Sequence, residues 1–457
     1  MNNTRTALPL TFGAALVLAL EFAAFGLPRD DRREMRNLQS FTDATGEVST
    51  FSTLGAIDEG NLFFQSLGTN GRSCASCHQA SDAWSITPEH VRARFDADGG
   101  LDPIFRTNDG SNSPLADVST VEARRQAYSM LLNKGLIRVG IGVPKDAEFE
   151  LIGVDDPYGY ASASELSLFR RPLPSTNISF LATVMWDGRE TFSGQSIHFD
   201  LSDQANGATL GHAAGDHELT EAQREEIVNF ESSLYTAQSK DLEAGNLQTQ
   251  GARGGPLRLS IEPFSIGIND TLSPEFNATS MTMYEEWSRL NRIAPDQYRS
   301  ARESVARGET LFNTLPIQIT GVHGLNDVLG QEVITGTCST CHNAPNVGNH
   351  SVSLPLDLGI ASEERRTADM PLYTFRNKET GEIVKTTDPG RALISGKWKH
   401  MSLFKGPILR GLAARPPYFH NGSAATIPDV VNFYNERFKL DLSEEQKQDL
   451  VAFLRSL

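Results

Sequence analysis

The chain has 457 residues, enough for roughly two or three domains of ordinary size and for a sizeable buried core. Apolar residues make up 39% of it and charged residues 21%, a balance that excludes global disorder and a fibrous repeat. With 57 acidic and 41 basic residues the formal net charge is −16, which argues against a general nucleic-acid binder.

The first predicted element is an apolar N-terminal segment. Residues 8–27 are largely apolar, follow the cation Arg5 and precede a charged run. This pattern is typical of an export signal, although a segment of this length could also span a bilayer. We therefore predict a signal peptide or membrane anchor at 1–27, a linker at 28–50, and a working part outside the cytoplasmic membrane, in the periplasm of a Gram-negative source.

Two halves of the chain repeat three features in the same order. Each half begins with a short apolar helix signal, at 60–67 and 308–315, and continues with a C-x-x-C-H motif. Each ends with a predicted helix, at 219–234 and 442–457, that starts with a capping box and has apolar residues at spacings of three and four. This order predicts two copies of one helical module.

The four cysteines form two C-x-x-C pairs, so a disulfide framework across the chain is excluded. In a C-x-x-C-H motif the two thiols can add to the vinyl groups of a haem while the next residue, His, reaches the iron. A zinc site would need more Cys or His ligands nearby, and a thioredoxin-like pair would need a βαβ context. We therefore predict two covalently bound haem c groups. Their attachment and ligand residues are Cys74, Cys77 and His78 in the first half and Cys338, Cys341 and His342 in the second.

The predicted fold class follows from these features. We expect a mostly α-helical protein with two cytochrome c-like domains, each carrying one haem c and long loop inserts. The N-terminal domain covers 51–238, a connector 239–299, and the C-terminal domain 300–457. A simple electron carrier needs little beyond a closed shell around each iron, so the long inserts favour an enzyme.

Four motifs in the inserts occur in a characteristic order. They are P-S-T-N at 174–177, M-W-D-G-R-E at 185–190, F-K-G-P-I-L-R at 404–410 and P-Y-F-H-N-G-S at 417–423. Together with the C-x-x-C-H motifs, this arrangement resembles the bacterial di-haem cytochrome c peroxidase and MauG family, and the resemblance spans most of the chain after about residue 55.

The resemblance implies that the N-terminal haem is the peroxidatic site, that the C-terminal haem passes electrons, and that Trp186 lies between them. It implies hydrogen peroxide as a substrate. The partner would be either a small cytochrome or copper protein that donates electrons, or a protein whose aromatic residues are oxidised. A non-catalytic di-haem electron carrier is the alternative from a different class of protein.

Tyr434 is the predicted sixth ligand of the second haem. In the family this position, fourteen residues after the His of F-H-x-G, is Met in the peroxidase branch and Tyr in the MauG branch, and counting from His420 reaches Tyr434. A phenolate is a hard anionic donor that favours ferric iron, whereas a thioether favours ferrous iron. One alternative is that Tyr434 is an ordinary helix-face aromatic and that Met401 is the ligand. Another is that the position is open or filled by a different ligand.

Candidates for acid–base chemistry at the first haem lie downstream of Trp186. Family members carry a distal Glu there; in this chain the region is longer, and His212 lies near the acid–base position, with Gln204 matching a distal Gln and Glu218 as the other candidate. A His with a near-neutral pKa could move the proton of peroxide between its two oxygens. His212 could equally bind the iron or be a surface residue.

Calcium is a doubtful further cofactor. The family often holds Ca²⁺ between its domains with an Asn side chain and backbone carbonyls. The carbonyl of Pro417 could serve here, but Arg415 precedes it, and no Asn occupies the matching place near Arg171 and Pro172.

Overall fold

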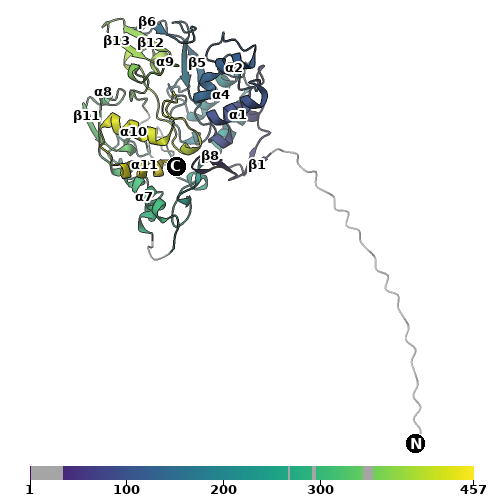
Figure 1. Cartoon of the computed structure of the whole chain (residues 1–457), viewed down its shortest axis with the longest axis vertical. Coiled ribbons are helices and arrows are strands. Elements are labelled where there is room, and N and C mark those ends of the chain that lie inside the picture. Colours follow the sequence, from purple (N-terminus) through teal and green to yellow (C-terminus); the bar gives the residue numbers. More distant parts are fainter. Residues whose placement is uncertain (2–33, 266–267, 291–294, 343–353) are drawn as a thin grey trace.

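The structure is a computed structural model that describes Met1 and residues 34–265, 268–290, 295–342 and 354–457 (Figure 1). Apart from Met1, the predicted signal or anchor at 1–27 lies outside these residues, as does the first part of the predicted linker. The described helices include none that is both long and apolar enough to cross a membrane.

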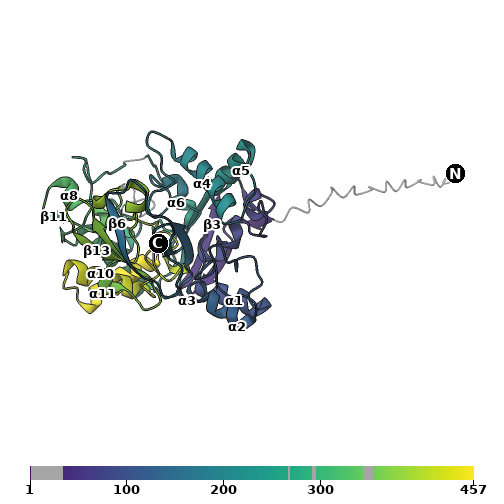
Figure 2. The same ribbon diagram turned by 90° about the horizontal axis from the view of Figure 1, so that it is seen from above.

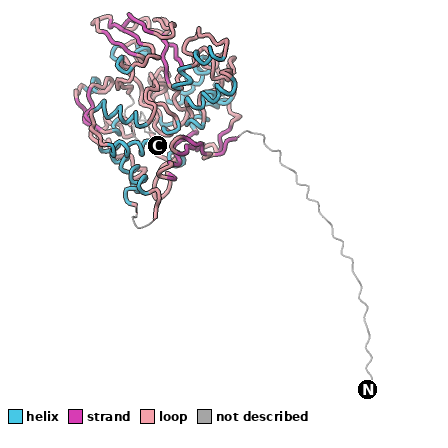
Figure 3. The backbone as a smooth tube through the Cα atoms, viewed as in Figure 1, coloured by secondary structure: helices cyan, strands magenta, loops and turns pink. Residues whose placement is uncertain are grey.

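The prediction of a mostly α-helical fold is wrong. Of the described residues, 32% are helical and 18% are in strands, and the strands form several sheets (Figure 3). The inserts that we expected to be loops supply five of these strands, at 137–141, 149–155, 166–170, 372–377 and 383–386. One of them, Leu166–Arg170, is buried along its whole length, as expected of a strand that packs on both faces.

The helices of the N-terminal half surround the first C-x-x-C-H motif. The predicted closing helix is present and begins with the expected capping box of Thr220 and Gln223. It ends at Ser232, because the chain continues from Leu234 as a strand. The helices of this half are η1 (Leu62–Phe64), η2 (Cys74–Ser76), η3 (Ala80–Asp82), α1 (Pro88–Asp98), α2 (Val121–Ala127), α3 (Ser129–Lys134), η4 (Ile178–Phe180), α4 (Ile197–Gly211) and α5 (Glu221–Ser232).

The helices of the C-terminal half include η6 (Cys338–Thr340), which forms the turn that carries the two cysteines of the second motif. Its closing helix also has the predicted capping box, formed by Ser443 and Gln446. The helices are α6 (Pro256–Leu259), η5 (Glu285–Arg289), α7 (Arg299–Thr314), α8 (Asn326–Leu329), η6 (Cys338–Thr340), η7 (Glu363–Arg365), α9 (Ala392–Ser395), η8 (Trp398–His400), η9 (Leu412–Ala414), α10 (Ile427–Phe438) and α11 (Glu444–Arg455).

The strands form small antiparallel sheets, in the orders β1-β4, β2-β3-β8-β9, β5-β7, β13-β12-β6 and β10-β11. The bounds are β1 (Glu34–Arg36), β2 (Ser40–Asp43), β3 (Gly46–Ser52), β4 (Ala56–Asp58), β5 (Ile137–Ile141), β6 (Phe149–Asp155), β7 (Leu166–Arg170), β8 (Leu234–Asp241), β9 (Gly245–Asn246), β10 (Ile317–Thr320), β11 (Val333–Gly336), β12 (Leu372–Asn377) and β13 (Ile383–Thr386).

The two halves lie side by side and share one sheet (Figure 2). Strand β6 of the first half pairs with β12 of the second, with Phe149 opposite Asn377 and Asp155 opposite Leu372. Inserts from both halves therefore meet at one edge of the molecule, where Figure 1 shows β6, β12 and β13 together with α9.

Each half has its own apolar core beside its C-x-x-C-H motif. In the first half Phe63, Trp84 and Phe230 pack together, with Cys74 at the border of the cluster. In the second half the core joins α7, α10 and α11, and Cys338 borders it. Helices α7 and α11 approach so closely that a Cβ at Gly308 would overlap the carbonyl oxygen of Asp449. The cores thus place each pair of thiols at the edge of an apolar interior.

Candidate haem sites and the tryptophan between them

Each C-x-x-C-H motif lines a separate cavity. The first cavity has an empty volume of about 1420 Å³ and the second about 1860 Å³, in both cases including space that opens to solvent. Most of the lining side chains are apolar, which suits a large flat hydrophobic group with a few polar attachments. The two cavities share part of their lining. The seven residues that line both are Arg171, Pro172, Leu173, Pro174, Trp186, Lys405 and Ile408.

The first motif has the geometry that a haem-ligating histidine needs. The Nδ1 of His78 lies 2.9 Å from the carbonyl oxygen of Trp84, so an N–H at Nδ1 would leave Nε2 free to bind iron. Burial lowers the pKa of His78 to about 4, the bond to Trp84 opposes this, and the charge of His212 lowers it further. The imidazole is therefore neutral at pH 7, the form that binds metals.

The second motif supplies the same three kinds of donor residue, two Cys and one His. Cys338 begins η6, and Thr337 forms a capping box with Thr340. Burial raises the pKa of Cys338 to about 12 and that of Cys341 to about 11. Two half-buried thiols and an imidazole on one short turn at an apolar cavity are the donor set for covalent haem attachment, so the residues at both motifs fit a haem c group.

Trp186 lines both cavities, as the resemblance implied for a residue between the haems. Its indole Nε1 donates to the carbonyl oxygen of Arg171 at 2.8 Å, and its own carbonyl oxygen accepts from the backbone N–H of Lys405 at 2.9 Å. The preceding residue, Met185, has φ of +65° and Gly188 has φ of +69°, which fold the W-D-G-R segment into a tight turn. The indole is thus fixed at both its ring and its backbone.

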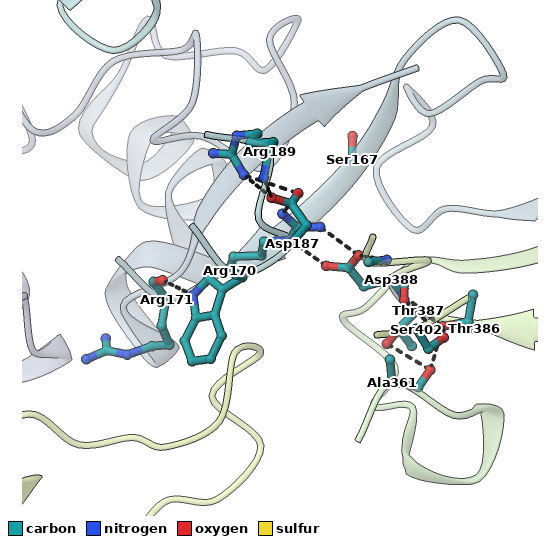
Figure 4. A network of polar contacts seen from close by, with 12 residues as sticks. Ser167, Arg170, Arg171, Asp187, Arg189, Ala361, Thr386, Thr387, Asp388 and Ser402 are labelled. Atoms are coloured by element: carbon teal, nitrogen blue, oxygen red, sulfur yellow. Dashed lines mark hydrogen bonds and ion pairs between the residues drawn. The ribbon is translucent and has the colours of Figure 1, made fainter. Parts of the chain in front are cut away.

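A buried ion network holds this turn against the C-terminal half (Figure 4). The guanidinium of Arg170 donates to Asp187 at 2.5 Å and, through two nitrogens, to Asp388 at 2.6 and 2.9 Å. Arg189 pairs with the same Asp187 at 3.1 Å. Burial opposes ionisation of Asp187, but the charges of Arg170 and Arg189 outweigh it and lower its pKa to about 2. Asp187 is therefore a carboxylate at neutral pH, and its bonds to Arg170 and Arg189 hold the turn that carries Trp186.

Replacing Asp187 with Asn should lower the free energy of unfolding by about 3 kcal/mol at pH 7, because the change leaves part of a buried arginine charge unbalanced. The folded-state pKa of Asp187 lies below its ordinary value, so its contribution is complete above pH 4 and is lost as the pH falls towards 2. The difference between wild type and variant should thus be about 1 kcal/mol smaller at pH 3 than at pH 7. Urea unfolding at both pH values measures it.

The matched control is Asp216→Asn, which removes the carboxylate of an exposed pair with His217. That variant should leave the free energy of unfolding almost unchanged. Equal effects of the two substitutions would contradict a structural role for the buried network.

His212 and Gln204 both line the first cavity, which brings together two of the residues predicted for acid–base chemistry. His212 directly follows α4, and its Nδ1 is hydrogen-bonded to the carboxylate of Asp109, which also pairs with Arg72. Burial opposes ionisation of Asp109, but His212 and Arg72 outweigh it and hold its pKa below the ordinary value. The third candidate, Glu218, is 71% exposed, pairs with Arg224, and is not among the described residues that line the cavity.

Sequence reasoning missed three polar residues of this cavity. Asp109 and Arg72 lie in irregular segments with no recognisable motif, far in sequence from His212. Glu231 had a visible signal, because it is an acidic residue between Phe230 and the apolar end of the closing helix. It is buried, and burial raises its pKa to about 8, so it is protonated at neutral pH.

Tyr434 lines the second cavity together with His342. It lies on α10, and its ring centre is 6.5 Å from that of His342, with the ring planes at 87°. Burial raises the pKa of the Tyr434 phenol. Met401 packs in a different cluster with Phe149 and Tyr373 and is not among the described residues that line this cavity. The structure thus brings the predicted ligand, and not its alternative, to the second motif.

Comparison with known proteins gives partial matches to one class of enzyme. No family model matches the chain. It is 33% identical over 140 residues to the cytochrome-c peroxidase IdrP2 of Denitromonas iodatirespirans, covering 28% of this chain and 38% of that protein. It is 28% identical over 238 residues to the cytochrome c551 peroxidase of Nitrosomonas europaea, covering 50% of this chain and 63% of that one. The matched part is thus less than two thirds of either relative.

A solved structure, that of a MauG-like protein associated with microbial copper homeostasis, aligns with 87% of this chain and 86% of its own, at 16% identity and a TM-score of 0.39. The curated relatives are peroxidases, so the chain is similar to haem enzymes of the cytochrome c peroxidase type.

Proposed function

We propose that the protein is an oxidoreductase with two haem c groups that reacts with hydrogen peroxide at the N-terminal site, and that electrons reach this site by way of the C-terminal haem. The observation that carries the proposal is that one buried tryptophan, Trp186, lines both C-x-x-C-H cavities. The similarity to cytochrome c peroxidases supports the choice of peroxide as substrate.

The protein's own residues have distinct roles in this proposal. When bound, the haem iron supplies the site at which the O–O bond of peroxide is broken. His212 would use Nε2 to take a proton from one peroxide oxygen and return it to the other, because its Nδ1 is already bonded to Asp109. Gln204 offers an amide that can donate to and accept from a bound peroxide. Asp109 fixes the orientation of the imidazole.

The source of the electrons divides the proposal into two forms. In one, a small cytochrome or copper protein reduces the second haem. In the other, the enzyme withdraws electrons from aromatic residues of a partner protein, as the resemblance to MauG implies. The position of Tyr434 at the second cavity favours the second form, because an anionic oxygen ligand stabilises oxidised iron. In either form we propose a periplasmic location.

A di-haem electron carrier is the alternative from another class. It would have both irons six-coordinate and would not react with peroxide. The polar group of Arg72, Asp109, Gln204 and His212 at the first cavity argues against it, since a carrier needs an apolar closed shell around its iron.

The test is to add hydrogen peroxide to the matured, fully oxidised protein and to follow the haem spectrum with time. We expect a lasting spectral change without prior reduction. A pyridine haemochrome assay should find two haem groups per chain in the wild type and one in the Cys338→Ala/Cys341→Ala variant. A reaction only after reduction of the second haem would support the conventional peroxidase form. No reaction in either state would overturn the proposal in favour of a carrier.

A further inference from the structure

A cluster of backbone carbonyl oxygens at the junction of the two halves encloses the guanidinium of Arg171, a residue that is only 5% exposed. In the described part of the chain, five carbonyls accept hydrogen bonds from its two terminal nitrogens. Nη1 donates to Gly135 at 3.0 Å and Lys134 at 3.3 Å, and Nη2 donates to Ile86 at 2.5 Å, Arg415 at 3.2 Å and Pro416 at 3.4 Å.

The charge of this guanidinium is balanced in an uncommon way. A buried arginine is ordinarily paired with a carboxylate. None of the described carboxylates forms an ion pair with Arg171; Asp82 adds a favourable charge from beyond ion-pair distance, and Arg415 repels it. Burial lowers the pKa of Arg171 to about 9, so the group remains a cation at pH 7. Carbonyl dipoles are therefore its main counter-charge.

The backbone is shaped to admit this side chain. Gly135 has φ of +59°, and a Cβ at that position would overlap Nη1 of Arg171. The carbonyls come from both halves, since residues 86, 134 and 135 precede the junction while 415 and 416 belong to the C-terminal half. The site is thus built from several segments around one cation.

Backbone carbonyl oxygens are also the hard ligands that Ca²⁺ prefers. A metal ion does not fit here, because the guanidinium already occupies the space between these oxygens. Among the described residues, no group of three or more His, Cys, Asp or Glu could hold a metal ion either. The residues present at the junction therefore do not fit the calcium ion that the resemblance made a candidate there.

We propose that Arg171 is the built-in cation of this junction and takes the place of a bound metal ion. The main chain of Arg171 links this cation to the residues between the two cavities. Its carbonyl oxygen accepts from the indole of Trp186, and its N–H donates to the carbonyl of His420 at 2.7 Å. Because this cation is part of the chain, the contact between the two halves and the position of Trp186 do not depend on the calcium concentration.

The experiment compares the thermal unfolding midpoint of the matured protein in EDTA and in millimolar CaCl₂. The wild type should give the same midpoint in both. Arg171→Ala should unfold several degrees lower in EDTA, regain part of the loss in CaCl₂, and bind one more equivalent of Ca²⁺ than the wild type in equilibrium dialysis, because the freed carbonyls accept a hard cation.

Arg124→Ala is the matched control, since that side chain also donates to backbone carbonyls, of Gly99 and Val118, but away from the junction. It should lower the midpoint with no calcium response. Arg171→Lys should fold and remain insensitive to calcium, because the ammonium still occupies the cluster. If Arg171→Ala does not mature, the comparison of Arg171→Lys with the wild type still tests the proposal. A wild type that loses stability in EDTA, an Arg171→Ala that gains no calcium response, or an Arg171→Lys that gains one would overturn the proposal.

Discussion

Replacing His212 with Ala should slow the reaction of the oxidised protein with hydrogen peroxide by about a hundredfold, the usual contribution of a positioned acid–base group. The geometry supports this size of effect. The imidazole lines the first cavity and is oriented by the buried carboxylate of Asp109. Without it, peroxide must exchange its proton with water alone.

Stopped-flow absorbance of the haem gives the second-order rate constant for peroxide. His198→Ala is the matched control, because that residue lies on the preceding helix α4 and forms an exposed pair with Glu225. The control should react at the wild-type rate. Asp109→Asn should slow the reaction less than His212→Ala, by about tenfold, because the imidazole stays in place but loses the charged acceptor that orients it.

An unchanged rate in His212→Ala would remove the acid–base assignment. If that variant instead gained a high-spin spectrum and reacted faster, His212 would be an iron ligand that blocks the site. The two results are distinguished in one experiment, since the spectrum before mixing reports the coordination of the iron and the trace after mixing reports the reaction.

The parts of the site that the sequence predicted are those whose chemistry requires neighbouring residues. Covalent attachment of haem needs two thiols and a histidine within one turn, so Cys74, Cys77 and His78 are recognisable without a structure. The capping boxes of α5 and α11 are equally local, because four consecutive residues contain the whole hydrogen-bonding pattern. The capping boxes were predicted at their observed positions.

The rest depends on contacts between distant segments. Strand β6 finds its partner β12 more than 200 residues later, and neither strand is recognisable as half of a sheet on its own. For the same reason the inserts were predicted as loops, and the fold as mostly helical. Asp109 belongs to the site only because the fold brings it next to His212. Glu218 lies outside the site, at the surface, where it pairs with Arg224.

Replacing Tyr434 with Met should raise the reduction potential of the second haem by on the order of 100 mV or more, since axial ligands set haem potentials over a range of about 0.8 V. Burial raises the pKa of the Tyr434 phenol, so at neutral pH only coordination to a cation would make it lose its proton. As a phenolate it stabilises ferric iron, whereas a thioether at the same position stabilises ferrous iron. Spectroelectrochemical titration of both haems measures the change.

Met401→Leu is the control, a substitution that conserves volume in a cluster apart from the second cavity. It should leave both potentials unchanged. A shift in Met401→Leu with none in Tyr434→Met would assign the ligand role to Met401 and contradict the proposed ligand role of Tyr434.

The same titration bears on which form of the reaction the protein uses. A low potential at the second haem, raised by Tyr434→Met, means that the wild-type site gives up an electron readily and is hard to reduce by an ordinary small cytochrome. Electrons would then have to come from a partner protein after the peroxide reaction, through Trp186, which lines both cavities. Tyr434→Met should in that case need prior reduction before it reacts with peroxide, as a conventional peroxidase does. If the variant keeps the wild-type reactivity of the oxidised protein, the axial tyrosine does not decide between the two forms.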